Sequence, residues 1–401
     1  MIQSKANDPR GLKEAKLRRR DWILLPMISL LTICCISVST ELIARSMFPA
    51  EGAVGETCMI VNDPSIGSQG IPNCVCWEKV PEGELTEYRF NSSGYRNDVE
   101  FGPKPPGTYR IVMLGTSIAA GIRVPLGKTF AALLPLELSR QTGRTVDLYN
   151  EGMPWRSPHF IALHFNDVLA AKPDMILWIL GPLDIERALW RTYVEQDAKS
   201  LSLWGRIRLR ATASFPKNSF TDSIGEIIKQ RRTPFLLRHF LFESQSQYIK
   251  SSLIQADYQK DFLRSEPSAE WQQRLEEFDR SAADLEGHAR AADIPLVAVL
   301  IPDRAQAAMI SMGEWPAGYD PYKLNEEVRS IITSHGGTYI DILPGFRPIP
   351  NPEKYYFPVD GHLDADGHRI VSGLLAKGLM SGAVPALNVA AQTRAAHEQG
   401  R

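Results

Sequence analysis

Five short apolar runs constrain the fold of this 401-residue chain more than any other feature. They have the length of strands and carry few polar residues, at 110–114, 145–149, 174–180, 295–301 and 338–342. Helical patterns separate most of them, for instance at 128–142 and 157–171. Near-continuous apolar strands that alternate with helices are typical of a parallel sheet covered on both faces. The sequence therefore predicts an α/β fold with a central parallel sheet.

A charge-free stretch near the start of the chain predicts one transmembrane helix. Residues 22–40 carry no charged side chain, and nineteen helical residues extend about 28 Å, close to the thickness of a bilayer's hydrocarbon core. Residues 1–20 carry seven basic side chains, whereas only Arg45 is basic between the stretch and Lys79. The positive-inside rule then predicts a cytoplasmic N-terminus and a periplasmic or extracellular main domain. A cleaved signal peptide is the alternative, but no small-residue cleavage site follows Thr40.

Composition divides the rest of the chain into segments. We expect a basic cytoplasmic tail (1–20), a transmembrane anchor (21–43), an extended lead-in (44–105), an α/β domain in two parts (106–185 and 289–383), a helical insertion between them (186–288) and a flexible tail (384–401). The lead-in is rich in Pro, Gly and Asn, which predicts few regular elements. The insertion ends in a helical pattern with Trp271, Leu275 and Phe278 on one face. We expect the insertion to pack over the carboxyl edge of the sheet.

Three of the five cysteines follow the apolar stretch, namely Cys58, Cys74 and Cys76. Outside the cytoplasm two of them can form a disulfide that closes the lead-in, and the spacing leaves the pairing open. The two cysteines of Cys74-x-Cys76 lack the spacing usual in zinc sites, so neither a metal nor another cofactor is expected. The formal net charge of −1 gives no reason to expect a nucleic-acid partner.

Ser117 is the candidate nucleophile, because it follows the first predicted strand at a glycine turn and precedes small residues that open a helix. Near the other end of the chain, His362 lies two residues after Asp360. The carboxyl ends of parallel strands lie at one edge of a sheet, so the loops after the first and fifth strands meet there. We therefore expect a catalytic triad in which Asp360 orients His362 and His362 activates Ser117.

A second histidine repeats the spacing of the first, since Asp366-Gly367-His368 matches Asp360-Gly361-His362. His368 stands at the start of the last predicted helix, where Asp and Gly are typical of a helix entry. His362 is therefore the preferred base, and His368 is its alternative.

These motifs resemble those of the SGNH (GDSL-like) hydrolases over roughly residues 60–380. The similar blocks are LGTSIAAG (114–121, with Thr116 in place of the usual Asp), Asn150-Glu151-Gly152, Gly181-Pro182-Leu183-Asp184 and FPVDGHLDADGHRI (357–370). The resemblance implies a three-layer sandwich and an oxyanion hole made by the backbone N–H groups of Ser117 and Gly152. FNSSGYRN (90–97) and LIPDRAQ (300–306) are similar to membrane-anchored or exported members, including proteins that handle O-acetyl groups on polysaccharides.

Leu183 departs from the family pattern, which has an Asn there as the third oxyanion donor. The loss of one such donor costs about 10² to 10³ in rate. Asn150 and Trp155 are candidates for a substitute donor, whereas Asn166-Asp167 falls inside a predicted helix and away from the edge.

Three residues are candidates for substrate binding: Trp155, Arg156 and Asp184. A ring face beside a charged donor, as in Trp155-Arg156, is suited to a sugar. A structural role for these residues is the alternative.

The sequence thus predicts a serine esterase or O-acyltransferase that acts on ester groups, with O-acetyl groups on a carbohydrate as the expected substrate. The expected partners are an ester-bearing small molecule or polysaccharide and, through the anchor, the membrane. One alternative is a catalytically weak or inactive glycan-binding or assembly protein, in keeping with Leu183. Another is a membrane-tethered scaffold that uses the helical insertion as a partner surface.

Overall fold

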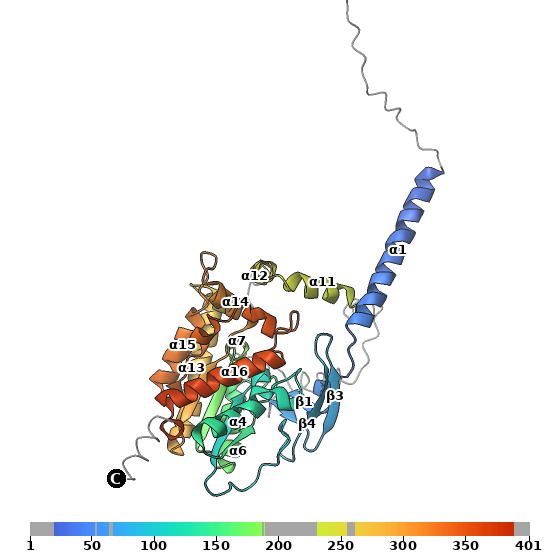
Figure 1. Ribbon diagram of the computed structural model, residues 1–401. Helices are drawn as coiled ribbons and strands as arrows, with labels where there is room; N and C mark the ends of the chain where they lie inside the picture. The colour runs from blue at the N-terminus through green and yellow to red at the C-terminus, as the bar shows by residue number, and fades with distance from the viewer. Residues whose placement is uncertain are drawn as a thin grey trace, which may run out of the picture.

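A five-stranded, wholly parallel sheet forms the centre of the protein (Figure 1). The computed structural model describes residues 20–52, 54–63, 67–186, 188, 231–254 and 261–388. In spatial order the strands are β6 (Val146–Asn150), β5 (Tyr109–Gly115), β7 (Met175–Leu180), β8 (Leu296–Leu300) and β9 (Thr338–Tyr339). The predicted α/β fold with a central parallel sheet is confirmed, and each predicted strand contributes to it.

Helices cover both faces of this sheet, which gives three layers. The inner strands β5, β7 and β8 are buried along their whole length, as their unbroken apolar sequence predicts. On one face lie α4 (Phe130–Thr142) and α16 (Ala365–Gly378). On the other lie α5 (Pro158–Leu163), α6 (Phe165–Ala170), α13 (Ala269–Ala291) and α15 (Lys323–Ser334). The helix predicted over 157–171 is therefore two short helices, with His164 between them.

The helical face predicted at the end of the insertion is the buried face of α13. Trp271, Leu275 and Phe278 are all buried in the core, and the ring of Phe278 lies 5.5 Å from that of Trp178 on β7. Burial of these side chains fixes the helix against the sheet.

Strand order reverses at β5, because β6 lies on one side of it and β7, β8 and β9 follow on the other. In open parallel sheets, ligands bind outside the carboxyl ends of the strands at such a reversal. Helix α3 (Ser117–Ala120) begins at this place, directly after β5.

The lead-in has more regular structure than its composition predicts. It contains α2 (Val54–Thr57) and two antiparallel hairpins, formed by β1 (Met59–Asp63) with β2 (Gly67–Gly70) and by β3 (Val75–Lys79) with β4 (Leu85–Arg89). A disulfide joins Cys58 to Cys74, and the thiol of Cys76 is free and buried. The hairpins pack on a small core of their own that includes Tyr88, Phe90 and the residues just after α3. Short hairpin strands that pack on a neighbouring element need no long apolar runs, so the sequence pattern that would predict them is weak.

Helix α1 (Asp21–Met47) stands away from the rest of the protein (Figure 1). It is long and apolar enough to cross a membrane, and the most apolar part of it is not buried by the rest of the chain, although Ala44 near its end is buried. A signal sequence would meet the same criterion.

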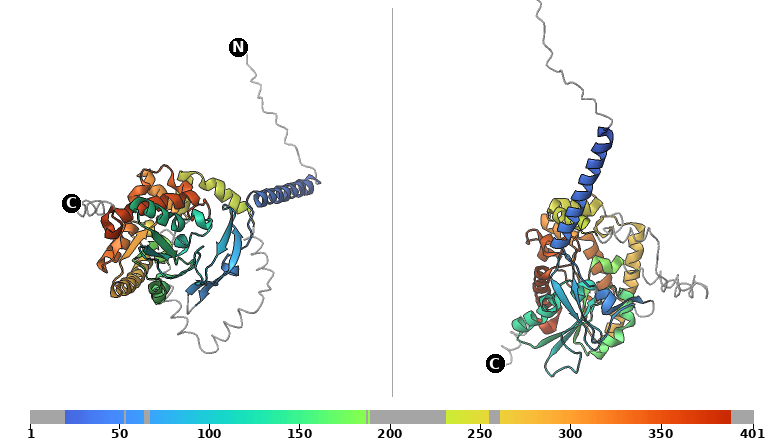
Figure 2. Two further views of the ribbon diagram at one scale, coloured as in Figure 1. Left: turned by 60° about the horizontal axis from the view of Figure 1, so that its bottom comes forward. Right: turned by 90° about the vertical axis from the view of Figure 1, so that its right-hand side faces the viewer.

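The insertion is described only in part. Its described helices before α13 are α11 (Thr233–Phe242), α12 (Gln245–Ile254) and the short 3-10 helix η3 (Asp261–Leu263). The aromatic residues Trp190, Trp204, Phe215 and Phe220 of the insertion lie outside the described residues. Helix α12 packs on α14 (Arg304–Met312), which follows the carboxyl end of β8, and α11 bridges from α12 to α1 (Figures 1 and 2).

Candidate active site

Ser117, His362 and Asp360 are joined by a continuous chain of hydrogen bonds. Nε2 of His362 lies 2.9 Å from Oγ of Ser117, and Nδ1 of His362 lies 2.6 Å from Oδ1 of Asp360. Ser117 is the first residue of α3, and the other two belong to the loop before α16, so residues 245 positions apart in sequence meet at one edge of the sheet. These distances suit a nucleophile, its general base and an acid that orients the base.

Two glycines give the backbone the shape that this contact needs. Gly115 ends β5 with φ +146, and a Cβ there would lie 2.4 Å from the carbonyl oxygen of Ile179 on β7. No side chain fits in that space, so the strand can pass close to β7 before it turns into α3. Gly361 has φ +84 and lies between Asp360 and His362, in a turn closed by the bond from the Phe357 N–H to the His362 carbonyl.

The carboxylate of Asp360 is held by charge on the side away from His362. Nε of Arg123 lies 3.3 Å from Oδ2 of Asp360, and Nη1 of Arg123 lies 2.8 Å from Oε1 of Glu78. Burial alone would raise the pKa of Asp360, but the hydrogen bond from His362 and the charge of Arg123 lower it below its ordinary value. Asp360 is therefore ionised at neutral pH and can stabilise a positive charge on His362.

Glu82 holds the backbone of the same loop. Its buried carboxylate accepts hydrogen bonds from the backbone N–H groups of Val359, at 3.0 Å, and Asp360, at 3.1 Å. Nδ1 of His239 on α11 lies 2.8 Å from Oε1 of the same carboxylate. The position of Asp360 thus depends on a residue of the lead-in and, through it, on α11.

Arg96 supports the backbone on the serine side. Its buried guanidinium donates to the carbonyl oxygens of Ala120, at 3.1 Å, Val124, at 2.7 Å, and Gly121, and lies over the ring of Tyr88. Sequence reasoning did not single out Arg96, Arg123 or Glu82 as parts of the site, although Arg96 lies in FNSSGYRN. Each acts through long-range polar contacts, which leave no periodic pattern in the sequence.

The predicted oxyanion donors lie where α3 meets the loop after β6. A Cβ on Gly152 would be 2.6 Å from the backbone nitrogen of Ala120, so only glycine allows this close packing against α3. The N–H of Ser117 is in the first turn of α3 and is not used within the helix. The N–H of Gly152, however, donates to Oδ1 of Asn150 at 2.9 Å, so this donor is engaged by a side chain in the structure.

Asn150, a candidate for the third oxyanion donor, and Leu183, which stands where the resemblance predicts an Asn, lie in different surroundings. Asn150 is buried, and its side-chain amide also donates to the carbonyl oxygen of Ala119 at 2.9 Å. Leu183, in α7 (Pro182–Glu186), has no polar side-chain atom and is 43% exposed. The side chain of Asn150 thus links the backbone after β6 to α3.

The three candidate substrate-binding residues lie in different surroundings. Trp155 is half-buried and packs against α2 at Gly55. Arg156 is buried, and its Nε donates to the carbonyl oxygen of Ser68 at 3.0 Å. Asp184 is buried and accepts from the N–H of Gly181 at 2.7 Å. A substrate-binding role for the three stays a prediction, and the latter two have clear structural contacts.

His368, the alternative base, is fully inside the protein. Its Nδ1 accepts the backbone N–H of Phe130 at 3.2 Å, which links α16 to the start of α4. Burial, with a smaller effect from the charge of Arg96, lowers the pKa of His368 to about 3. The ring is therefore neutral and serves as a structural acceptor.

A separate cavity of about 590 Å³ lies between the lead-in and β6. Tyr95, Tyr149 and Glu151 line it, whereas none of the three triad residues does. Burial raises the pKa of Glu151 to about 7, and the nearby charge of Arg156 opposes this. Within the described ranges, no group of three or more His, Cys, Asp or Glu side chains is placed to hold a metal ion.

Comparison with known proteins gives matches only among solved structures, since no family model and no curated protein matches the chain. The chain is similar to an alpha/beta hydrolase from the metagenome of Lake Arreo, with 15% identity, a TM-score of 0.38 and coverage of 70% of this chain and 96% of the other. It is also similar to a catalytic mutant of an acetylxylan esterase from Geobacillus stearothermophilus, with 11% identity, a TM-score of 0.35 and coverage of 68% of this chain and 94% of the other. A third similar structure is a lipolytic G-D-S-L family protein from Veillonella parvula, with 11% identity, a TM-score of 0.33 and coverage of 68% of this chain and 99% of the other. At these values no activity is carried over, and the chemistry is inferred from the site's own atoms.

We predict that Glu82→Gln lowers kcat about 10- to 100-fold on a small aryl acetate while KM changes little. A glutamine keeps one acceptor oxygen but removes the charge, so the N–H groups of Val359 and Asp360 lose charge-assisted bonds worth about 1.5–3 kcal/mol. Glu84→Gln is the matched control, because Glu84 lies two residues away, exposed and paired with Lys128. Equal kcat for the two variants, both shown to be folded, would contradict a positioning role for Glu82.

We also predict that Glu151→Gln makes the protein more stable than the wild type at pH 8 but not at pH 4. The folded state binds the Glu151 proton more tightly than the unfolded state, so wild-type stability falls as pH rises from the ordinary pKa of 4.5 to about 7. The relative gain of the variant should reach roughly 3 kcal/mol above pH 7. Urea unfolding at several pH values measures it, and a gain independent of pH would refute the raised pKa.

Proposed function

We propose that this protein acts on esters through a serine nucleophile, as an esterase or an O-acyltransferase, with O-acetyl groups on a carbohydrate as the expected substrate. The observation that carries the proposal is the bond chain from Ser117 through His362 to Asp360, with distances of 2.9 and 2.6 Å. The site lies outside the carboxyl ends of the strands where strand order reverses, which is where such sheets bind ligands.

The geometry supports the following mechanism. Nε2 of His362 accepts the proton of Ser117 as Oγ attacks the ester carbonyl, and the carboxylate of Asp360 stabilises the charged imidazole. The N–H groups of Ser117 and Gly152 stabilise the oxyanion, and for this the Gly152 N–H exchanges its bond to Asn150 for one to the substrate. The protonated His362 then donates its proton to the leaving alcohol, which leaves an acyl group on Ser117.

The second half of the reaction releases the acyl group. His362 takes a proton from an incoming water or sugar hydroxyl, whose oxygen attacks the acyl carbonyl. The bond from the carbonyl carbon to Oγ then breaks, and His362 returns the proton to Oγ of Ser117. Attack by water completes an esterase reaction, and attack by a sugar hydroxyl completes a transfer. The two reactions use the same residues and differ only in the acceptor.

We further propose that α1 anchors the protein and that the catalytic part lies outside the cytoplasm. The basic residues before α1 favour this orientation. The disulfide between Cys58 and Cys74 supports it independently, because disulfides persist in oxidising compartments.

Two observations favour a second candidate function, that of a glycan-binding or assembly protein with little turnover. Leu183 supplies no third donor, and Asn150 engages the N–H of Gly152. Such a protein would keep the fold and bind an acetylated glycan without cleaving it.

We predict that a fluorophosphonate probe labels the wild-type protein, and that labelling is lost in Ser117→Ala and strongly reduced in His362→Ala. The probe reacts with a serine whose proton is taken by a nearby base, so both partners are needed. Ser330→Ala, an exposed change on α15, is the control that should label like the wild type. A folded wild type that does not label would reject the esterase and favour the second candidate.

We predict that Leu183→Asn raises kcat on a small aryl acetate about tenfold or more, because it returns an oxyanion donor of a kind worth about 10² to 10³ in rate. Leu183→Ala is the matched control, since it removes the exposed side chain without adding a donor. If the two variants turn over equally, the missing donor does not limit the reaction.

A further inference from the structure

Helix α11 presents large apolar side chains to solvent although it is part of a folded domain. Its sequence, TPFLLRHFLF, is apolar on every side of the helix apart from Arg238 and His239. Leu237, Phe240 and Leu241 are 65%, 51% and 42% exposed. A helix that is apolar all round is normally buried in a core or in a membrane.

The start of α11 is hydrogen-bonded to α1 at Glu41. The carboxylate of Glu41 accepts the backbone N–H groups of Arg232 and Thr233, both at 3.0 Å, and the hydroxyl of Thr233 at 2.9 Å. Directly after the end of α1, the ring of Phe48 lies 5.2 Å from that of Phe235 on α11. Glu41 is the first charged residue after the charge-free stretch 22–40, so α11 begins at the level where α1 leaves its apolar segment.

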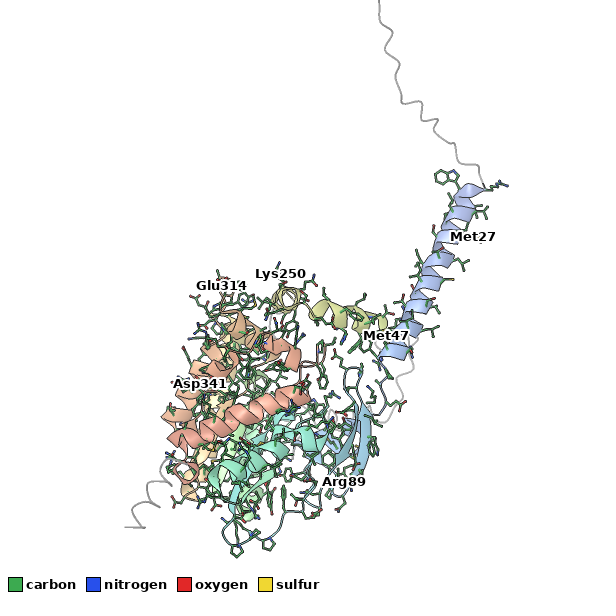
Figure 3. The ribbon with its side chains drawn as sticks, in the orientation of Figure 1. Met27, Met47, Arg89, Lys250, Glu314 and Asp341 are labelled. Carbon is green, nitrogen blue, oxygen red and sulfur yellow. A yellow bond between two sulfur atoms is a disulfide. The ribbon has the colours of Figure 1, made fainter. Side chains whose placement is uncertain are left out.

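From this level α11 runs away from α1 along the edge of the domain that faces it (Figures 1 and 2). Figure 3 shows Met47, at the lower end of α1, beside the start of α11, and Lys250 of α12 on the same edge. Arg231 and Arg238 are also exposed there, and Glu243, directly after α11, is the exposed acidic residue beside them. Apolar side chains flanked mainly by basic ones match the boundary between acyl chains and anionic headgroups.

We propose that α11 is an interfacial helix that lies on the bilayer beside α1, with Leu237, Phe240 and Leu241 among the lipids. This inference rests on the membrane anchoring in the proposed function, and it is independent of the ester chemistry. The opposite side of α11 faces the protein, where Phe242 is buried and His239 contacts Glu82. The helix that meets the lipid is therefore the one that supports the loop of Asp360.

The test uses the full chain in vesicles of phosphatidylcholine and phosphatidylglycerol. In the chains that carry a new cysteine, Cys34 and Cys35 are replaced by serine. Leu241→Cys is labelled with an environment-sensitive fluorophore, while the buried Cys76 stays unlabelled in the folded protein. The readout is quenching by lipids with a nitroxide near the headgroup. Leu136→Cys on α4, 68% exposed, is the matched site away from α11. Native Cys35, labelled in a chain that lacks the other exposed cysteine, reports whether α1 is in the bilayer.

We expect quenching at position 241 to exceed that at 136 at least threefold, and to be the same when Ser117→Ala is also present. Equal quenching at 241 and 136, with Cys35 strongly quenched, would overturn the interfacial helix while the anchor stands. If Cys35 is not quenched either, the anchor and the interfacial helix both fall. A label at 241 that is shielded only as protein concentration rises would assign the surface to a second copy of the chain and would equally overturn the proposal.

Discussion

The contact between His362 and Ser117 depends on where one short loop is held, because the two residues lie 245 positions apart in the sequence. The parallel sheet brings both chain segments to one edge, but the loop that carries His362 could still hold its side chain at several distances from Ser117. Glu82 binds the loop backbone, and Arg123 binds the carboxylate of Asp360 from the side opposite His362. These two contacts, one a pair of hydrogen bonds to a carboxylate and the other an ion pair, position the loop so that Nε2 of His362 lies 2.9 Å from Oγ of Ser117.

The features that could be predicted from sequence are those that local burial determines. The inner strands β5, β7 and β8 are apolar at nearly every position, and α13 repeats its large side chains at helical spacing, so each is visible in a short window. The meeting of Ser117 and His362 followed from one further rule, that parallel strands end at a common edge. The break between α5 and α6 was missed, since no proline or glycine marks His164.

The features that could not be predicted depend on partners far away in sequence. Nothing near Glu82 shows that it accepts backbone N–H groups 277 residues later, and nothing near Arg123 shows that it joins Glu78 to Asp360. The pairing of Cys58 with Cys74 likewise depends on how the hairpins fold, since Cys58 directly precedes β1 and Cys74 directly precedes β3, while Cys76 lies within β3. The bond from Gly152 to Asn150 is local, yet it depends on how α3 packs against both.

The described residues of the lead-in are packed against the rest of the protein rather than extended away from it. Phe48 packs on α11, the backbone of Glu51 pairs with that of Lys79, and after the second hairpin Arg96 donates to the carbonyl oxygen of Ala120 at the end of α3. A flexible tether would let Ser117 sample many distances from the end of α1, whereas a packed lead-in restricts that distance. Under the proposed function, a polymeric substrate would have to bring its ester groups to this distance from the membrane, so the packing of the lead-in and not the length of a linker would set the reach of the site.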